Sequence, residues 1–140
     1  MEPVTNYDLV REFHQAFDLQ LDGDFNEKTI DLRCTLHDEE VFEAFCELNN
    51  QLISKHGSEW EVKQPDEIDK AALTKELADI LYVVYGTAAS FGLPINEAFR
   101  EVHRSNMSKL GEDGKPIKRE DGKALKGPNY TEADIGQFFK

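Results

Sequence analysis

Apolar residues recur at intervals of three and four along four stretches of this 140-residue chain, a spacing that predicts four helices. The first stretch shows the pattern most clearly, through Leu9, Val10, Phe13 and Phe17. Thr5 stands where it can cap that helix, and glycines stand where the later helices stop. The predicted helices run from about Asn6 to Leu19, Glu27 to Lys55, Asp69 to Ser90, and Pro94 to Gly111.

Turn-forming residues mark the segments between and after these helices. Ser58 to Asp66, which includes Trp60 and Pro65, is predicted to be a loop. In the tail, Glu-Asp-Gly-Lys occurs at 112–115 and again at 120–123, and Asp121-Gly122 suits a two-residue hairpin turn. We therefore expect a single all-α domain over residues 1–140. It would be a four-helix bundle with a helical core over about 5–110 and a turn-rich basic tail, 111–140, that is irregular or a β-hairpin.

The chain is strongly acidic, with a net charge of −12 at pH 7 and a pI of about 4.7. Such a charge disfavours a nucleic-acid polymer or an anionic membrane as the partner. No apolar run approaches the ~20 residues of a membrane span, and the N-terminus lacks the pattern of a signal peptide. Cys34 and Cys46 lie on one predicted helix, too far apart to bridge within a subunit. We therefore expect a cytoplasmic protein with reduced thiols.

Five acids in two groups are the most informative residues. Glu39, Glu40 and Glu43 fall within about 100° of arc on the second predicted helix, and Glu76 and Asp79 lie one turn apart on the third. The first group alone could be a solvated face, because the apolar residues of that helix lie opposite. Glu76, however, falls within the apolar arc of its helix, and carboxylates are seldom buried unless paired or metal-bound. Together the groups predict a cage for a hard divalent cation.

Other metal-site patterns lack residues that they need. The segment from Asp22 begins like a calcium loop, but it has Glu27 where that loop needs glycine and Arg33 where it needs an acid. His14 has no second His or Cys at ligand spacing, which argues against zinc. Taken alone, His14 is better explained as a core or partly exposed histidine.

Basic residues concentrate near the end of the chain. Asn106 and Lys109 project from the last turn of the fourth predicted helix, and Lys115 and Lys123 follow in the two repeats. In so acidic a chain this concentration suggests contact with phosphate, and a solvated helix end is the alternative. With the acid cage it indicates metal-assisted hydrolysis of a polyphosphate. Two or three Mg²⁺ ions would neutralise the substrate and align a water molecule for attack.

The split acid motif, Glu39-Glu40-x-x-Glu43 followed by Glu76-Leu77-Ala78-Asp79, resembles the signature of the all-α nucleoside triphosphate pyrophosphohydrolases. That superfamily includes MazG, the dimeric dUTPases and dCTPases, and phosphoribosyl-ATP pyrophosphohydrolase. The run from Glu101 to Leu110 and the repeats of the tail are similar to a MazG-like subgroup of bacteria and phages. The resemblance implies an enzyme of nucleotide-pool control that converts a (d)NTP into a (d)NMP and pyrophosphate. It would act in the bacterial cytoplasm, or in the host cytoplasm if a phage encodes it.

The resemblance also implies a role for each candidate residue. Glu40, Glu43, Glu76 and Asp79 would bind Mg²⁺ or Mn²⁺, and Glu39 would help bind a second ion and position the attacking water. Such proteins are homodimers or dimers of dimers. The remaining implied contacts are with phosphates, for Asn106, Lys109, Lys115 and Lys123, and with the base, for His14 and Phe17.

The substrate is less well defined than the reaction. The base is open between guanine, in dGTP or GTP, and uracil, in dUTP, because no residue is a decisive donor or acceptor for one base. Two other functions also stay open. One is hydrolysis of phosphoribosyl-ATP, which the extra tail disfavours. The other is a non-catalytic, cation-binding helical protein that acts through a partner.

Overall fold

Two compact units make up the chain, Met1–Leu93 and Pro94–Lys140. The computed structural model describes residues 2–54 and 57–140 and, apart from residues 51–60, their side chains. The division falls before the fourth helix, so that helix belongs with the tail and the first unit holds the other three.

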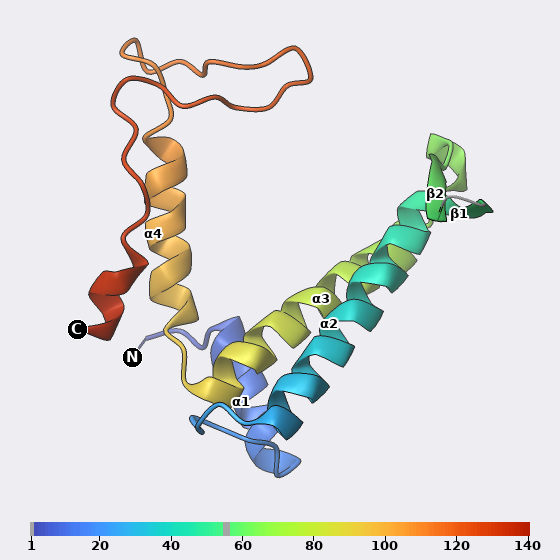
Figure 1. Cartoon of the computed structure of the whole chain (residues 1–140), viewed down its shortest axis with the longest axis vertical. Coiled ribbons are helices and arrows are strands. Elements are labelled where there is room, and N and C mark those ends of the chain that lie inside the picture. The colour runs from blue at the N-terminus through green and yellow to red at the C-terminus, as the bar shows by residue number, and fades with distance from the viewer. Residues whose placement is uncertain (1, 55–56) are drawn as a thin grey trace. The chain divides into compact units, whose positions relative to one another are not determined.

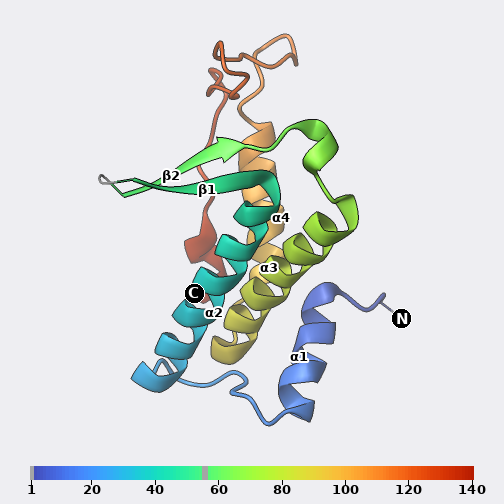
Figure 2. The same ribbon diagram turned by 90° about the vertical axis from the view of Figure 1, so that its right-hand side faces the viewer.

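Three helices form the first unit: α1 (Asn6–Ala16), α2 (Glu27–Leu48) and α3 (Lys70–Phe91). Each begins at a side chain that accepts a hydrogen bond from the first helical turn, namely Thr5, Asn26 and Asp69. α2 and α3 run antiparallel along one another, and α1 packs against α3 (Figures 1 and 2). α3 therefore lies between the other two helices.

The interior of this unit is small and contains polar groups. Its buried apolar residues are Val10, Ala44, Val83, Ala88 and Ala89. Arg33 is only 6 % exposed and donates to Thr87 Oγ1 and to the Val83 carbonyl oxygen, each at 3.1 Å. Among the described residues, its guanidinium has no carboxylate within ion-pair distance.

Gly86 makes room for this buried guanidinium. A Cβ at position 86 would lie 2.5 Å from Arg33 Nη2 and 3.0 Å from His14 Nε2. The glycine therefore allows two polar side chains, one from α2 and one from α1, to approach the backbone of α3.

A β-hairpin stands where the sequence predicts helix and loop. α2 ends at Leu48, and β1 (Asn49–Ser54) pairs antiparallel with β2 (Gly57–Val62), from Asn49↔Val62 to Ser54↔Gly57. The predicted continuation of helix over 49–54 and the predicted loop over 58–62 are therefore wrong; Lys55 itself lies outside the described residues. Two consecutive asparagines, Asn49 and Asn50, favour this end because asparagine side chains compete for backbone hydrogen bonds.

The second unit consists of α4 (Ile95–Met107), a turn-rich segment and the short 3₁₀ helix η2 (Ile135–Phe139). The two sequence repeats adopt the same turn. The amide of Gly114 donates to Gly111 O and that of Gly122 to Arg119 O, each at 2.9 Å, and both glycines have positive φ. The predicted hairpin in the tail is present as one bridge, Lys118↔Ala124, closed by a three-residue loop and not by two residues.

After the hairpin the chain folds back along α4. The amide of Gly127 donates to Lys109 O at 2.8 Å, and Ser105 Oγ donates to Thr131 O at 2.8 Å. Arg104 donates to Thr131 Oγ1 at 2.6 Å and to Glu132 O at 3.0 Å. Arg104 also pairs with Glu101, and this hydrogen bond, with one from the Asp134 amide, lowers the pKa of Glu101 to about 2.

The predicted all-α fold is confirmed, since the described residues form four α-helices and a short two-stranded hairpin. No single α-helix in that part of the chain is both long and apolar enough to cross a membrane.

Candidate metal centre

Three carboxylates converge where α2 and α3 pack together. One carboxylate oxygen from each of Glu40, Glu43 and Glu76 lies within 4.8 Å of the other two. Glu40 and Glu43 are three residues apart on α2, so they share one face of that helix, and Glu76 reaches them from the second turn of α3. The structure thus joins acids from the two sequence groups.

Two carboxylate oxygens of this cluster are buried without a partner. Glu40 Oε2 and Glu76 Oε2 are almost fully shielded from solvent, and neither accepts a hydrogen bond from the described residues. Burial raises the pKa of Glu40, and repulsion from Glu43, Asp79 and Glu76 raises it further. Leaving a charged oxygen in this state costs more than the 1–3 kcal/mol of a neutral polar group. An oxygen-lined site with surplus negative charge fits a hard cation such as Mg²⁺ or Mn²⁺.

Asp79 lies at the edge of this cluster and already has a partner. Lys75 Nζ is 2.7 Å from Asp79 Oδ2 and 3.7 Å from Glu76 Oε1. The hydrogen bond to Asp79 raises the pKa of Lys75, while Lys75 acts to lower the pKa of Glu40. Lys75 was not among the site residues predicted from the sequence, although a basic residue directly before Glu76 and four residues before Asp79 could have indicated it.

Glu39, the predicted catalytic acid, is exposed on α2 and lies outside the three-carboxylate cluster among the described side chains. It is adjacent in sequence to Glu40 and therefore turned about 100° from it around the helix. The side chain of Glu39 is therefore open to solvent beside the cluster.

His14 and Phe17, the predicted base-binding residues, point into different environments. His14 is 2 % exposed, and its Nδ1 lies 3.0 Å from the Gln20 carbonyl oxygen. Burial lowers its pKa. Phe17 is 66 % exposed and packs on Phe13, with ring centroids 4.4 Å apart. The structure does not bring the two side chains together.

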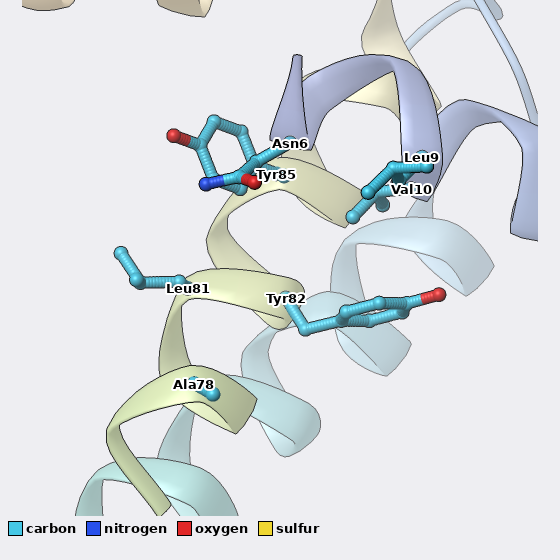
Figure 3. Close-up of a pocket in the computed structure, with 7 residues that line it drawn as sticks. All are labelled: Asn6, Leu9, Val10, Ala78, Leu81, Tyr82 and Tyr85. Carbon is cyan, nitrogen blue, oxygen red and sulfur yellow. The ribbon is translucent and has the colours of Figure 1, made fainter. Parts of the chain in front are cut away.

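A pocket of about 180 Å³ does form between α1 and α3, as Figure 3 shows. Its residues on α3 were not predicted from the sequence, because they lie on the side of that helix away from Glu76. Ala78, for example, follows Glu76 by two positions and so points about 160° away from it. The pocket is lined by Asn6, Leu9 and Val10 of α1 and by Ala78, Leu81, Tyr82 and Tyr85 of α3.

The predicted phosphate-binding residues all belong to the second unit. Asn106 is exposed in the last full turn of α4, and Lys109 follows the helix and is half-buried. Lys115 and Lys123 are exposed and occupy equivalent positions in the two turns. Among the described residues, none of these three lysines makes an ion pair. Their approach to the acids of the first unit stays a prediction.

Comparison with known proteins identifies the family of this arrangement. The model of the phosphoribosyl-ATP pyrophosphohydrolase family matches residues 10–106, a range that holds all five acids and ends within α4. No curated protein matches the chain. Proteins of this family are metal-dependent hydrolases that act on phosphoric anhydrides. The chain belongs to the phosphoribosyl-ATP pyrophosphohydrolase family, within the MazG-like all-α nucleoside triphosphate pyrophosphatases.

Proposed function

We propose that the protein hydrolyses a (deoxy)nucleoside triphosphate to the monophosphate and pyrophosphate, with divalent ions held by Glu40, Glu43, Glu76 and Asp79. The observation that carries the proposal is the pair of buried, unpartnered oxygens, Glu40 Oε2 and Glu76 Oε2, inside a hydrolase family that depends on metal. When bound, Mg²⁺ or Mn²⁺ offsets the negative charge of the acids and the triphosphate and lowers the pKa of a coordinated water.

Side chains of the protein accept the proton and stabilise the leaving group. Exposed Glu39 accepts the proton of the attacking water, whose oxygen joins phosphorus as the bond between the α- and β-phosphates breaks. The ammonium groups of Lys109, Lys115 and Lys123, which form no ion pair among the described residues, stabilise the charge that develops on the pyrophosphate. Asn106 donates a hydrogen bond to it.

A screen of products tests this proposal. Standard and modified (d)NTPs are incubated with the protein and Mg²⁺ or Mn²⁺, without added pyrophosphatase, and the products are separated by chromatography. We expect monophosphate and pyrophosphate, with dGTP, GTP and dUTP as the first substrates to compare. Inorganic phosphate as the first product, or no turnover of any triphosphate, would contradict the proposal.

Phosphoribosyl-ATP is the second candidate substrate, because the matching family carries that name. Its hydrolysis breaks the same kind of bond and needs the same acids, so the metal centre favours neither substrate. Including phosphoribosyl-ATP in the screen separates the two: a kcat/KM for it far above that for every (d)NTP would assign the protein to that reaction.

We also propose that the protein is a homodimer or a dimer of dimers. Large apolar side chains remain on the surface of the first unit, among them Phe42 at 57 % and Phe45 at 54 % exposure. Burying such a surface against a second copy removes it from water.

A further inference from the structure

Lys75 provides the ammonium group that pairs with the predicted metal ligands in the described structure. It directly precedes Glu76 on α3 and binds Asp79 at 2.7 Å, one turn further along the same helix. Glu76 Oε1 is also within 3.7 Å of it. The side chain of Lys75 is 69 % exposed, so its ammonium can move to a new partner while α3 stays in place.

The lysine neutralises only the edge of the acid cluster. Its ammonium leaves Glu40 Oε2 and Glu76 Oε2 without a partner. A divalent ion that uses Asp79 together with the three clustered glutamates competes with Lys75 for this carboxylate, and binding through Oδ2 breaks the Lys75–Asp79 pair. The ammonium released in this way faces the solvent beside the metal centre, where a polyphosphate that binds the same ions would place its oxygens.

Helix stabilisation alone is a weak explanation for this pair. A lysine four residues before an aspartate has the less favourable of the two orientations for an ion pair on a helix. Exposed pairs of this kind contribute about 0–1 kcal/mol to stability. The position of Lys75 against Asp79 and Glu76 therefore points to the metal centre more than to the helix.

We propose that Lys75 is an exchangeable counter-ion of the metal centre. It holds Asp79 when the divalent site is empty, and it binds a phosphate oxygen of the substrate when the site is filled. The second half rests on the proposed function; the first half does not.

A metal titration without substrate tests the first half. Mn²⁺ binding is measured by calorimetry for the wild type, for Lys75→Met and for Lys70→Met. Lys70 is a matched control, because it is an exposed lysine of the same helix, and the described residues give it no ion pair. We expect Lys75→Met to bind Mn²⁺ about two- to fivefold more tightly, as the loss of an exposed competing pair implies. Lys70→Met should bind like the wild type. Equal or weaker binding by Lys75→Met, or the same gain in both variants, overturns the proposal.

Steady-state kinetics test the second half on whichever nucleotide the wild type hydrolyses. At saturating Mg²⁺, Lys75→Met should raise KM about ten- to a hundredfold, as loss of a hydrogen bond to a charged group implies. Lys75→Arg, which keeps the charge, should restore most of the affinity, and Lys70→Met should leave the rate unchanged. Tighter metal binding together with weaker substrate binding is a combination that a structural role would not produce. An unchanged KM in Lys75→Met overturns the second half. If the wild type hydrolyses no nucleotide, the proposed function fails, and the Mn²⁺ titration alone decides on Lys75.

Discussion

Glu76 brings a carboxylate of α3 to the two clustered glutamates of α2, so its charge adds to theirs. Glu76→Gln removes that charge with little change of shape. In the presence of a chelator, we expect the free energy of unfolding of the variant to be about 1 kcal/mol higher than that of the wild type, because the substitution removes a buried carboxylate charge that has no partner among the described residues. With Mg²⁺, turnover should fall by several orders of magnitude.

Equilibrium unfolding in chelator and a rate assay at saturating Mg²⁺ check both parts of this expectation. Glu12→Gln, an exposed acid of α1, serves as the control for loss of charge. Wild-type turnover in Glu76→Gln would show that the acid cluster is not the catalytic metal centre.

Two histidines, buried His14 and half-buried His37, make stability depend on pH in a defined direction. Burial lowers the pKa of His14 and of His37 below the ordinary value of 6.5, and the charge of Arg33 lowers both further. The unfolded chain therefore takes up protons first as the pH falls through 6.5, so the free energy of unfolding should decrease from about pH 7.5 to 5.5.

His37→Gln isolates this effect, because His37 Nε2 bonds Thr87 Oγ1 at 2.7 Å and an amide can keep a hydrogen bond there. Urea unfolding across the pH range should show a shallower decrease in the variant than in the wild type. Glu40, whose raised pKa contributes in the opposite sense, is present in both proteins. Identical slopes would contradict a neutral His37 in the folded state.

At the scale of elements, Arg104 is one of the residues that hold the C-terminal segment on α4. Its guanidinium joins Glu101, Thr131 and Glu132, so Arg104→Met should loosen residues 127–139 and speed their cleavage by chymotrypsin at Phe138 and Phe139. Arg100→Met, an exposed arginine of the same helix, is the control. Equal cleavage rates in the two variants would show that other contacts hold the segment.

Acid should loosen the same segment. The folded-state pKa of Glu101, about 2, lies below its ordinary 4.5, so the stabilisation is present above pH 4.5 and is lost as the pH falls towards 2.

The two equivalent turns of the tail allow a test of the prediction that Lys115 and Lys123 bind substrate phosphates. Lys115→Ala combined with Lys123→Ala should raise KM for the triphosphate at least tenfold, with unchanged folding, since neither side chain makes an ion pair within the described protein. Lys28→Ala combined with Lys70→Ala changes the net charge equally and is the control. An equal rise in KM for both double variants would show that the effect comes from the net charge of the protein and not from these two turns.

Local spacing explains which parts of the structure the sequence predicted. Glu40 and Glu43 could be predicted to lie together because residues three apart share one face of a helix. The repeated turns could be predicted because glycine after aspartate readily adopts the positive φ that a tight turn needs. The hairpin after Leu48 was missed because Leu48, Leu52 and Ile53 fit the helical period as well as they fit a strand. The available signal for an end of the helix was the pair Asn49-Asn50. Asp79 was placed with the cluster because only the acids were considered, although Lys75 stands four residues before it on α3, a spacing that brings two side chains together.

At the scale of the whole molecule, we expect the protein to self-associate through the apolar side chains near the end of α2. Phe45, Leu48 and Val62 are exposed and border, with Asn49, a hollow of about 280 Å³. Phe45→Asp should shift the protein towards monomers in analytical ultracentrifugation, because a carboxylate cannot be buried there without a partner. Val4→Asp, at a residue that is 71 % exposed, is the control. A monomeric wild type at micromolar concentration would contradict the assembly.

Gly86 limits how this protein could be engineered for heat tolerance. Replacing a glycine inside a helix with alanine ordinarily gains about 1 kcal/mol, and Gly86 is the one glycine within the four described α-helices. Here the added methyl group would meet Arg33, whose guanidinium is buried and fixed by Thr87 and Val83. Moving that guanidinium would break its hydrogen bonds and leave a buried positive charge without partners, and arginine cannot lose that charge by deprotonation. Gly86→Ala should therefore not stabilise this protein, although such a substitution is the usual first choice. A directed-evolution library gains nothing by sampling larger residues at this position.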